Sequence, residues 1–270
     1  YRAAVLHAAK SPLVIETVTA SALKPTDILV RVRAAGLCHT DLEVIEGSLR
    51  FPMPIVLGHE AAGIVEEVGS AARGVKKGDH VILSWNPHCG HCFYCDRDLP
   101  ILCDEYLGEG PKARSFDGES RATLMDGRNL QHLMFLGSFG EYCIVPDQQA
   151  IPVPKGIPFD RACLIGCGVM TGVGSALNLG AIAHGDTVMV IGCGAVGLAA
   201  VQGARLAGAG AIIAVDLDPA KLALATTMGA TSTVNASNED AVATAKNETS
   251  GRGADVVIES AGSPMAFRVT

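Results

Sequence analysis

The sequence has no basic run and no acidic tail, and its formal net charge is −7 over 270 residues. Proteins that bind nucleic acids carry a basic face that displaces counterions from the phosphate backbone, so this charge distribution argues against a nucleic-acid partner. The chain also lacks a charged segment followed by an apolar core at its start, and it opens at Tyr1 rather than at an initiator Met. We therefore expect no secretory signal and a cytoplasmic protein, and the missing Met leaves earlier processing or trimming open.

Unbroken hydrophobic runs are also absent. Two charge-free stretches, Ala162–Ala183 and Thr187–Ala204, are long enough for a hydropathy window to score them as membrane spans. Glycines interrupt both, and the second changes partway from a strand-like run to a glycine turn. Buried parallel strands and the helices packed on them have this composition, because they are covered on both faces. The sequence therefore predicts no membrane partner.

Length and rhythm predict two domains. A chain of 270 residues can bury the cores of two ordinary domains. The first 150 residues contain short extended segments punctuated by Gly and Pro, which indicates a β-rich domain: Ala3–Leu6, Asp27–Ala35, Ala61–Val68, His80–Leu83 and Glu141–Val145. After Ile182, strands and helices alternate, which predicts a parallel sheet: Thr187–Ile191, Ala195–Ala207, Ala211–Asp216, Pro219–Met228, Thr231–Val234, Glu239–Glu248 and Asp255–Glu259.

The predicted boundary divides the chain into domains 1–165 and 166–270, with the substrate cleft of a two-domain enzyme near 160–170. One segment inside the first domain fits neither pattern. Arg114–His132 is polar, contains glycine and has little periodicity, so we expect a surface loop there.

Nine cysteines in a chain without a secretory signal are expected to be metal ligands or buried apolar residues, because reducing compartments disfavour structural disulfides. Four of them form the pattern C-x2-C-x2-C-x7-C, with Gly90 in the first gap: Cys89, Cys92, Cys95 and Cys103. Four thiolates from one loop fit a closed tetrahedral zinc site. The long last gap and the lack of Pro after the fourth cysteine do not match the bacterial ferredoxin pattern of iron–sulfur proteins.

The remaining cysteines divide into two groups. Cys143, Cys163 and Cys193 are expected to be small buried hydrophobic residues, and His88 and His91, beside the zinc ligands, to be exposed loop residues. Cys38 and His59 each have a carboxylate close by in sequence, Asp41 and Glu60, and Cys167 lies between two glycines. Two thiolates and one imidazole would leave a fourth coordination position for water or substrate, which distinguishes a catalytic zinc site from a structural one.

A glycine-rich turn predicts a dinucleotide site. It has the spacing G-x-G-x-x-G, follows a strand-like run and opens a helical one: Gly192, Cys193, Gly194, Ala195, Val196 and Gly197. Such glycines permit a tight turn and bring the backbone and a helix N-terminus close to a pyrophosphate. Asp216 follows Gly197 by 19 residues at the end of the next predicted strand. An acid there binds ribose hydroxyls and repels a 2′-phosphate, so NAD is predicted rather than NADP.

These motifs together resemble the zinc-containing medium-chain dehydrogenase/reductase family, in particular its alcohol dehydrogenase branch. The resemblance covers essentially the whole chain and rests on four motifs in the family's order: Gly58–Gly63, the four-cysteine segment, Gly166–Gly168 and the glycine turn. It implies an α/β protein in which a GroES-like, zinc-binding catalytic domain precedes a Rossmann domain with a doubly wound parallel sheet. The chain stops soon after the fourth strand of that sheet, so we expect the Rossmann domain to be incomplete.

The resemblance implies roles for individual residues. Cys38, His59 and Cys167 resemble the catalytic zinc ligands, Glu60 the carboxylate beside the metal, and Asp41 the acid that orients the ligand histidine. Thr40 resembles the hydroxyl that takes the alcohol proton, although Glu43 stands where the family commonly has a relay histidine. Further positions resemble contacts to NAD (His39 to the pyrophosphate, Thr171 near the nicotinamide and Lys221 on the ribose side) and the substrate pocket (Leu49, Trp85 and Phe135).

The implied activity is reversible hydride transfer between a primary, apolar or aromatic alcohol and NAD+, with two zinc ions per chain, one catalytic and one structural. The insert after Cys103 resembles the dimeric, animal-type branch, so a homodimer is expected. Two alternatives stay open: another zinc dehydrogenase of the family, acting on a polyol, an amino alcohol or a thiol adduct of formaldehyde, and a non-catalytic zinc- and nucleotide-binding protein. The thiol adduct is disfavoured, because the positions that would carry its acids and arginine hold Ser48, Arg50 and Leu107.

Overall fold

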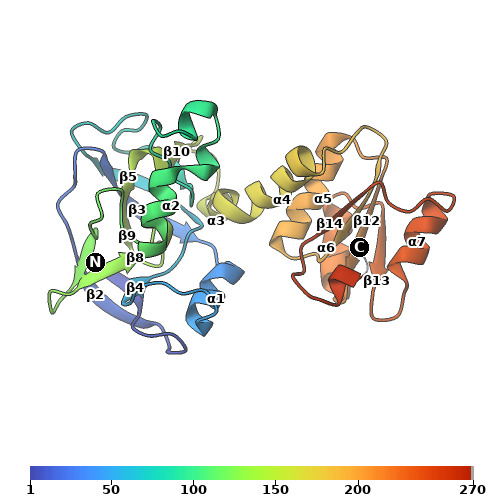
Figure 1. The fold of residues 1–270 in the computed structure, drawn as a ribbon, viewed down its shortest axis with the longest axis horizontal. Coiled ribbons are helices and arrows are strands. Elements are labelled where there is room, and N and C mark those ends of the chain that lie inside the picture. Colours follow the sequence, from blue (N-terminus) through green and yellow to red (C-terminus); the bar gives the residue numbers. More distant parts are fainter. Residues whose placement is uncertain (269–270) are drawn as a thin grey trace. The chain divides into compact units, whose positions relative to one another are not determined.

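The computed structural model describes residues 1–268, which fold into two compact units (Figure 1). The first comprises residues 1–167 and the second begins at Gly168, two residues after the domain boundary at 165/166 drawn from the sequence. Each unit has its own sheet structure and its own buried core.

The first unit contains two β structures. One is a closed barrel in the order β1 (Arg2–Leu6), β2 (Val14–Ala20), β7 (Ala122–Leu124), β8 (Asn129–His132) and β4 (Ile55–Val56). The other is a five-stranded antiparallel sheet in the order β10 (Ala150–Pro152), β6 (His80–Leu83), β5 (Ala61–Val68), β3 (Asp27–Ala35) and β9 (Tyr142–Pro146). Its helices are α1 (His39–Glu46), α2 (Asp104–Glu109) and α3 (Phe159–Leu164).

β3 lies between β5 and β9 in the five-stranded sheet, and its alternating side chains place one face of the strand in the core. Ile28 and Val30 point into a core that they share with Ala61 and Val65 of β5 and with residues of β6 and β9. A residue-by-residue alternation of this kind places every second side chain on the buried face. The predicted strands Asp27–Ala35, Ala61–Val68 and His80–Leu83 coincide with β3, β5 and β6.

The surface loop expected over Arg114–His132 was wrong. The segment contains β7 and β8, which pair with β2 and β4 and close the barrel. Ala122, Leu124 and Leu130 are buried in the core of that barrel. The two strands are only three and four residues long, so they show too little alternation to be recognised locally. They pair with each other, but their other partners, β2 and β4, lie far away in the sequence.

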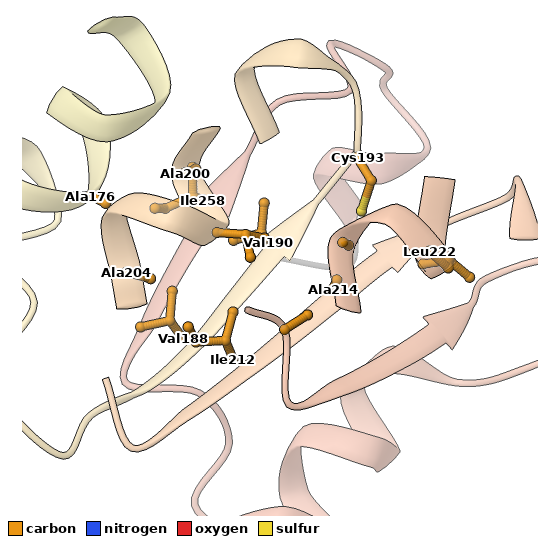
Figure 2. Close-up of a cluster of buried hydrophobic side chains, with 13 residues drawn as sticks. Ala176, Val188, Val190, Cys193, Ala200, Ala204, Ile212, Ala214, Leu222 and Ile258 are labelled. Atoms are coloured by element: carbon orange, nitrogen blue, oxygen red, sulfur yellow. The ribbon is translucent and has the colours of Figure 1, made fainter. Parts of the chain in front are cut away.

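The second unit has a parallel sheet in the order β13, β12, β11, β14, formed by β11 (Thr187–Ile191), β12 (Ala211–Asp216), β13 (Ser232–Asn235) and β14 (Val256–Glu259). Its helices are α4 (Met170–Gly174), α5 (Ala195–Ala207), α6 (Pro219–Met228) and α7 (Ala241–Glu248). Side chains from one face of the sheet pack with α5 and α6, as Figure 2 shows for Val188, Val190, Ile212 and Ala214. The other face packs with α7. Helices therefore cover both faces, as in doubly wound folds.

The two charge-free stretches of the sequence form regular secondary structure. Thr187–Ala204 divides into the buried strand β11 and the start of α5, as expected. The run Phe159–Leu179 is helical, and by length and composition alone it could cross a membrane. A third of its most apolar window is buried. A single such helix is weak evidence, because core helices of globular proteins pass the same test.

A buried ion-pair network ties β7 to the start of β3. The side chain of Arg121 is 7% exposed, and its Nε donates to Asp27, which is 1% exposed, over 2.6 Å. The same guanidinium donates to both carboxylate oxygens of Asp117 over 3.0 Å. Because a buried carboxylate without a cation is costly, the network fixes the barrel to the sheet.

Replacing Arg121 should therefore destabilise the first unit. We expect Arg121→Leu to lower the free energy of unfolding by roughly 3–5 kcal/mol, because Asp27 would remain buried without a cation. Urea unfolding can be followed by the fluorescence of Trp85, the only tryptophan in the chain. The control Arg2→Leu removes a pair with Glu141 whose side chains are 70% and 45% exposed, so it should cost no more than about 1 kcal/mol. Equal losses in the two variants would contradict the prediction.

Candidate functional site

The four-cysteine segment folds into a site with the dimensions of a zinc–thiolate cluster. The four sulfur atoms all lie within 4.8 Å of one another, and none forms a disulfide. Sγ of Cys95 lies 3.5 Å from Sγ of Cys92 and 3.9 Å from Sγ of Cys89. Tetrahedral zinc with bonds of about 2.3 Å requires sulfur–sulfur distances of about 3.8 Å. The segment is therefore arranged to hold zinc without large movement.

The backbone around this segment favours metal binding. Gly90 has φ of +81°, which turns the chain between the first two thiols. Backbone N–H groups point at the sulfur atoms, and the one from Cys95 is the main reason why the pKa of Cys92 is lowered to about 6. His91 is exposed, as expected, and its Nε2 lies 3.5 Å from Glu105. Cys103 is the buried member of the four, and α2 begins directly after it.

A second cluster brings together the residues predicted for the open metal site. The ligand atoms of Cys38, His59, Glu60 and Cys167 all lie within 4.8 Å of one another. Cys38 is the N-cap of α1, and His59 and Glu60 directly precede β5. Cys167 comes from a π-helical turn, Ile165–Val169, a geometry that is frequent at functional sites. His59 and Glu60 are 1% and 4% exposed, so this cluster is enclosed on the protein side.

Asp41 joins two of the segments that form this cluster. Its Oδ2 accepts a hydrogen bond from the backbone N–H of Cys38 over 3.1 Å, and its Oδ1 accepts one from Gly58 over 2.9 Å. Oδ1 also lies 3.4 Å from Nδ1 of His59, which has no aligned hydrogen-bond partner within residues 1–268. A carboxylate at Nδ1 directs the other ring nitrogen, Nε2, towards a metal.

The pKa values of the thiols and the imidazole in this cluster are shifted in ways that favour binding of a cation. Hydrogen bonds from Cys167 and His59 lower the pKa of Cys38 to about 3. The hydrogen bond with Cys38, together with burial, raises the pKa of Cys167 far above its ordinary value. Burial opposes the charge on His59, but Asp41 and Cys38 outweigh it and raise the pKa of His59 to about 9. One thiolate is thus preformed, and a metal ion would displace the protons of the other ligands.

The glycines of the turn in the second unit differ in the space around them. A Cβ on Gly197 would lie 1.8 Å from the carbonyl oxygen of Gly192, so no larger residue fits there. A Cβ on Gly194 would meet nothing within 4 Å. Gly194 is exposed and is the N-cap of α5, whose first N–H groups are free of intrahelical partners. The open space therefore suits an anionic group at the helix N-terminus.

Asp216 is held beside this turn. Its Oδ2 accepts the backbone N–H of Cys193 over 2.7 Å, and its Oδ1 accepts those of Leu217 and Asp218 over 2.8 and 2.9 Å. Burial opposes ionisation, but these hydrogen bonds and the nearby charge of Lys221 lower the pKa of Asp216 below its ordinary value. An ionised carboxylate thus stands at the end of β12, next to Gly192–Gly197.

The other residues predicted to contact NAD or the substrate differ in their exposure. His39 and Thr171 are exposed, and Thr40 is half-buried in the first turn of α1. Leu49 lines an open cavity of about 610 Å³ with Val44, Phe51 and other residues that do not include Trp85 or Phe135.

Trp85 is partly buried, whereas Phe135 is 3% exposed and packs between the rings of Tyr106 and Phe116. Gln149 and Tyr106, which hold the backbone around Trp85, had no local signal in the sequence.

Comparison with known proteins identifies the family. Residues 24–155 match the family described as alcohol dehydrogenase GroES-like domain, and residues 195–270 match that described as zinc-binding dehydrogenase. A solved alcohol dehydrogenase zinc-binding domain protein from Burkholderia ambifaria is 39% identical to the chain, with a TM-score of 0.93, over 99% of this chain and 72% of that one. The chain belongs to the zinc-containing alcohol dehydrogenase family. The family and the fold class predicted from the sequence are thereby confirmed.

Two further members of the zinc-containing alcohol dehydrogenase family show the range of relatives. The benzyl alcohol dehydrogenase of Acinetobacter calcoaceticus is 33% identical with a TM-score of 0.91, over 99% of this chain and 72% of that one. The S-(hydroxymethyl)glutathione dehydrogenase of Saccharomyces cerevisiae is 41% identical over 234 residues, which are 86% of this chain and 61% of that protein. The chain thus spans about three fifths of the length of this curated relative.

The glycine turn gives a matched pair of substitutions. We expect Gly194→Val to weaken dinucleotide binding at least about tenfold while the thermal unfolding temperature changes little, because the new side chain enters open space at the anion site. Gly197→Val should instead destabilise the second unit, because its side chain collides with the backbone of Gly192. Titration with NADH and thermal unfolding measure the two effects. Normal binding by the Gly194 variant would show that the pyrophosphate does not lie there.

Proposed function

We propose that this chain acts as a zinc-dependent alcohol dehydrogenase, which transfers hydride reversibly between an alcohol and NAD+ and yields an aldehyde or ketone. The observation that carries the proposal is the enclosed cluster of Cys38, His59, Glu60 and Cys167, whose ligand atoms converge within 4.8 Å. A protein that used zinc only for stability would already have the complete four-thiol site and would not need this second cluster. This argues against the non-catalytic alternative.

The residues divide between two zinc ions per chain. Cys38, His59 and Cys167 would hold the catalytic ion with Glu60 beside it, and Cys89, Cys92, Cys95 and Cys103 the structural one. When bound, zinc supplies a Lewis acid that makes the alcohol oxygen more acidic, and NAD+ supplies the hydride acceptor. The enclosed position of His59 and Glu60 limits access of water to the reacting oxygen.

Thr40 is the residue proposed to accept the proton of the alcohol. It lies in the first turn of α1, two residues after Cys38, and its backbone N–H hydrogen bonds to the sulfur of Cys38. Its position relative to the metal ligands is therefore fixed by the helix that Asp41 anchors. Glu43 stands where the family commonly has a relay histidine, so the proton would leave Thr40 by another route.

The proposed cofactor is NAD. Gly192, Gly194, Ala195, Val196 and Gly197 would bind the pyrophosphate, with His39 as a further contact. The ionised Asp216 would bind the ribose hydroxyls with Lys221 nearby, and Thr171 would lie near the nicotinamide. A carboxylate at this position repels the 2′-phosphate of NADP.

The proposed substrate is a primary alcohol with an apolar or aromatic group. Trp85 and Leu49 supply apolar surface, and one solved relative is a benzyl alcohol dehydrogenase. Curated relatives named for S-(hydroxymethyl)glutathione keep a thiol adduct as the second candidate. Activity on formaldehyde only in the presence of glutathione would favour that candidate. The homodimer and the cytoplasmic location inferred from the sequence remain part of the proposal.

Loss of one ligand should separate the two metal sites. We expect zinc-loaded Cys167→Ser to bind one zinc ion fewer and to lose at least about 10³-fold in kcat/KM, because the Lewis acid is lost with the ion. Its unfolding midpoint should change little. Cys103→Ser should also lose one ion but lower the unfolding midpoint strongly, because the four-thiol segment has little core of its own. Metal analysis by mass spectrometry, turnover and urea unfolding give the readouts. Full activity of Cys167→Ser with one ion fewer would overturn the site assignment.

Coenzyme choice should depend on Asp216. We expect Asp216→Asn to weaken NADH binding roughly tenfold and to narrow the preference for NADH over NADPH, because the charge that repels a 2′-phosphate is gone. Fluorescence titration with each coenzyme measures this. The control Asp218→Asn changes a neighbouring carboxylate that caps α6, where Asn caps equally well. If both variants keep the original preference for NADH over NADPH, Asp216 does not bind the ribose.

A further inference from the structure

Trp85 comes two residues after a strand end that contacts the segments carrying the proposed metal ligands. It follows β6, whose last residue, Leu83, pairs with Ala61, two residues after His59. The carbonyl oxygen of Leu83 also faces Gly166, where a Cβ would lie 2.5 Å away. Gly166 directly precedes Cys167. The end of β6 thus touches two ligand-bearing segments. The position of Trp85 depends on how the backbone of Ser84 and Trp85 is held after that end.

Gln149 holds the residue before Trp85. It is fully buried, and its Nε2 donates to the carbonyl oxygen of Ser84 over 2.8 Å and to that of Met134 over 3.0 Å. The backbone carbonyl oxygen of Gln149 accepts the backbone N–H of Ser84 over 2.8 Å. Its Oε1 has no partner among the described residues. A buried amide oxygen without a partner costs free energy, and the two hydrogen bonds that the Gln149 amide donates offset that cost.

Tyr106 holds Trp85 itself. Its hydroxyl donates to the carbonyl oxygen of Trp85 over 3.1 Å, and its ring meets the ring of Phe135 edge-on with the centroids 5.4 Å apart. Like Gln149, it therefore connects the backbone at residues 84–85 with the turn at residues 134–135. Edge-to-face contacts of this kind add to the stability of the packing.

The turn at Met134 and Phe135 needs such support. Both residues have left-handed backbone conformations, with φ of +53° and +62°. Side chains other than glycine rarely adopt these angles, and such conformations persist only where the surroundings enforce them. Gln149 binds the carbonyl of the first residue, and Tyr106 packs on the ring of the second.

We propose that Gln149 and Tyr106 are positioning residues that fix Trp85 beside the metal ligands and thereby set which alcohols fit. Neither touches the reacting atoms. Their effect on selectivity rests on the proposed function, whereas their effect on the position of Trp85 can be measured without turnover. The two effects therefore need two readouts.

The first readout is the fluorescence of Trp85, the only tryptophan in the chain. Acrylamide quenching of zinc-loaded Gln149→Leu should increase about twofold, because the segment around Trp85 opens locally. Tyr106→Phe, which keeps the ring and removes only the hydroxyl, should cause a smaller increase. Gln131→Leu is the matched control: Gln131 is also a buried amide (4% exposed), but it accepts a hydrogen bond from Arg114 in the barrel. Its quenching should remain unchanged.

The second readout is selectivity between a bulky and a small alcohol. In Gln149→Leu, kcat/KM for benzyl alcohol should fall about tenfold, while that for ethanol changes less than about twofold, because only the bulky substrate needs the Trp85 wall. Equal losses on both alcohols, or quenching that matches the unmodified chain in both variants, would overturn the proposal. If Gln149→Leu does not fold, Tyr106→Phe decides by the same two measurements. Increased quenching in a chain that turns over no alcohol would support the positioning of Trp85 and overturn the proposed function.

Discussion

The arrangement of the candidate active site depends on the carboxylate of Asp41. It accepts backbone N–H groups from Cys38 and Gly58, which are twenty residues apart. Cys38 is itself a proposed ligand and the N-cap of α1, and Gly58 directly precedes the proposed ligand His59. Asp41 is 2% exposed, and a buried charge is tolerated only when hydrogen bonds replace its water. These two N–H groups meet that need, and the same oxygen that binds Gly58 lies next to His59. Asp41 thus adds a side-chain link between the start of α1 and the approach to β5, beside the backbone hydrogen bond that Gly36 donates to the carbonyl of Glu60.

Chemistry that depends on local spacing could be predicted from the sequence. The intervals between Cys89 and Cys103 indicate one metal site whatever the surrounding fold, because four thiols in a short loop can reach a common point. The glycine turn and Asp216 were predicted in the same way, and the structure joins them by a hydrogen bond from Cys193 to Asp216. The alternation of strand and helix after Ile182 predicted the parallel sheet, and helices cover its strands on both faces.

Features made by long-range pairing could not be predicted. β7 and β8 are strands because β2 and β4 pair with them, and a polar segment with few apolar residues gives no local sign of that. The packing of Phe135 is similar, since Tyr106 and Phe116, whose rings meet its ring, come from other parts of the chain. Gln149 is similar, since a glutamine followed by alanine has no distinctive pattern and its partners lie 65 and 15 residues away.

These contacts also connect the structural zinc segment with substrate choice. Tyr106 lies on α2, which begins at Asp104 directly after the last cysteine of the four. The segment itself exposes Phe93, Leu99 and Ile101 and so buries little apolar surface of its own. A metal bound by the four thiols would therefore constrain where α2 starts, and α2 carries the Tyr106 hydroxyl that meets Trp85. A metal site that takes no part in the reaction can in this way shape the wall of the pocket in which the reaction is proposed to occur.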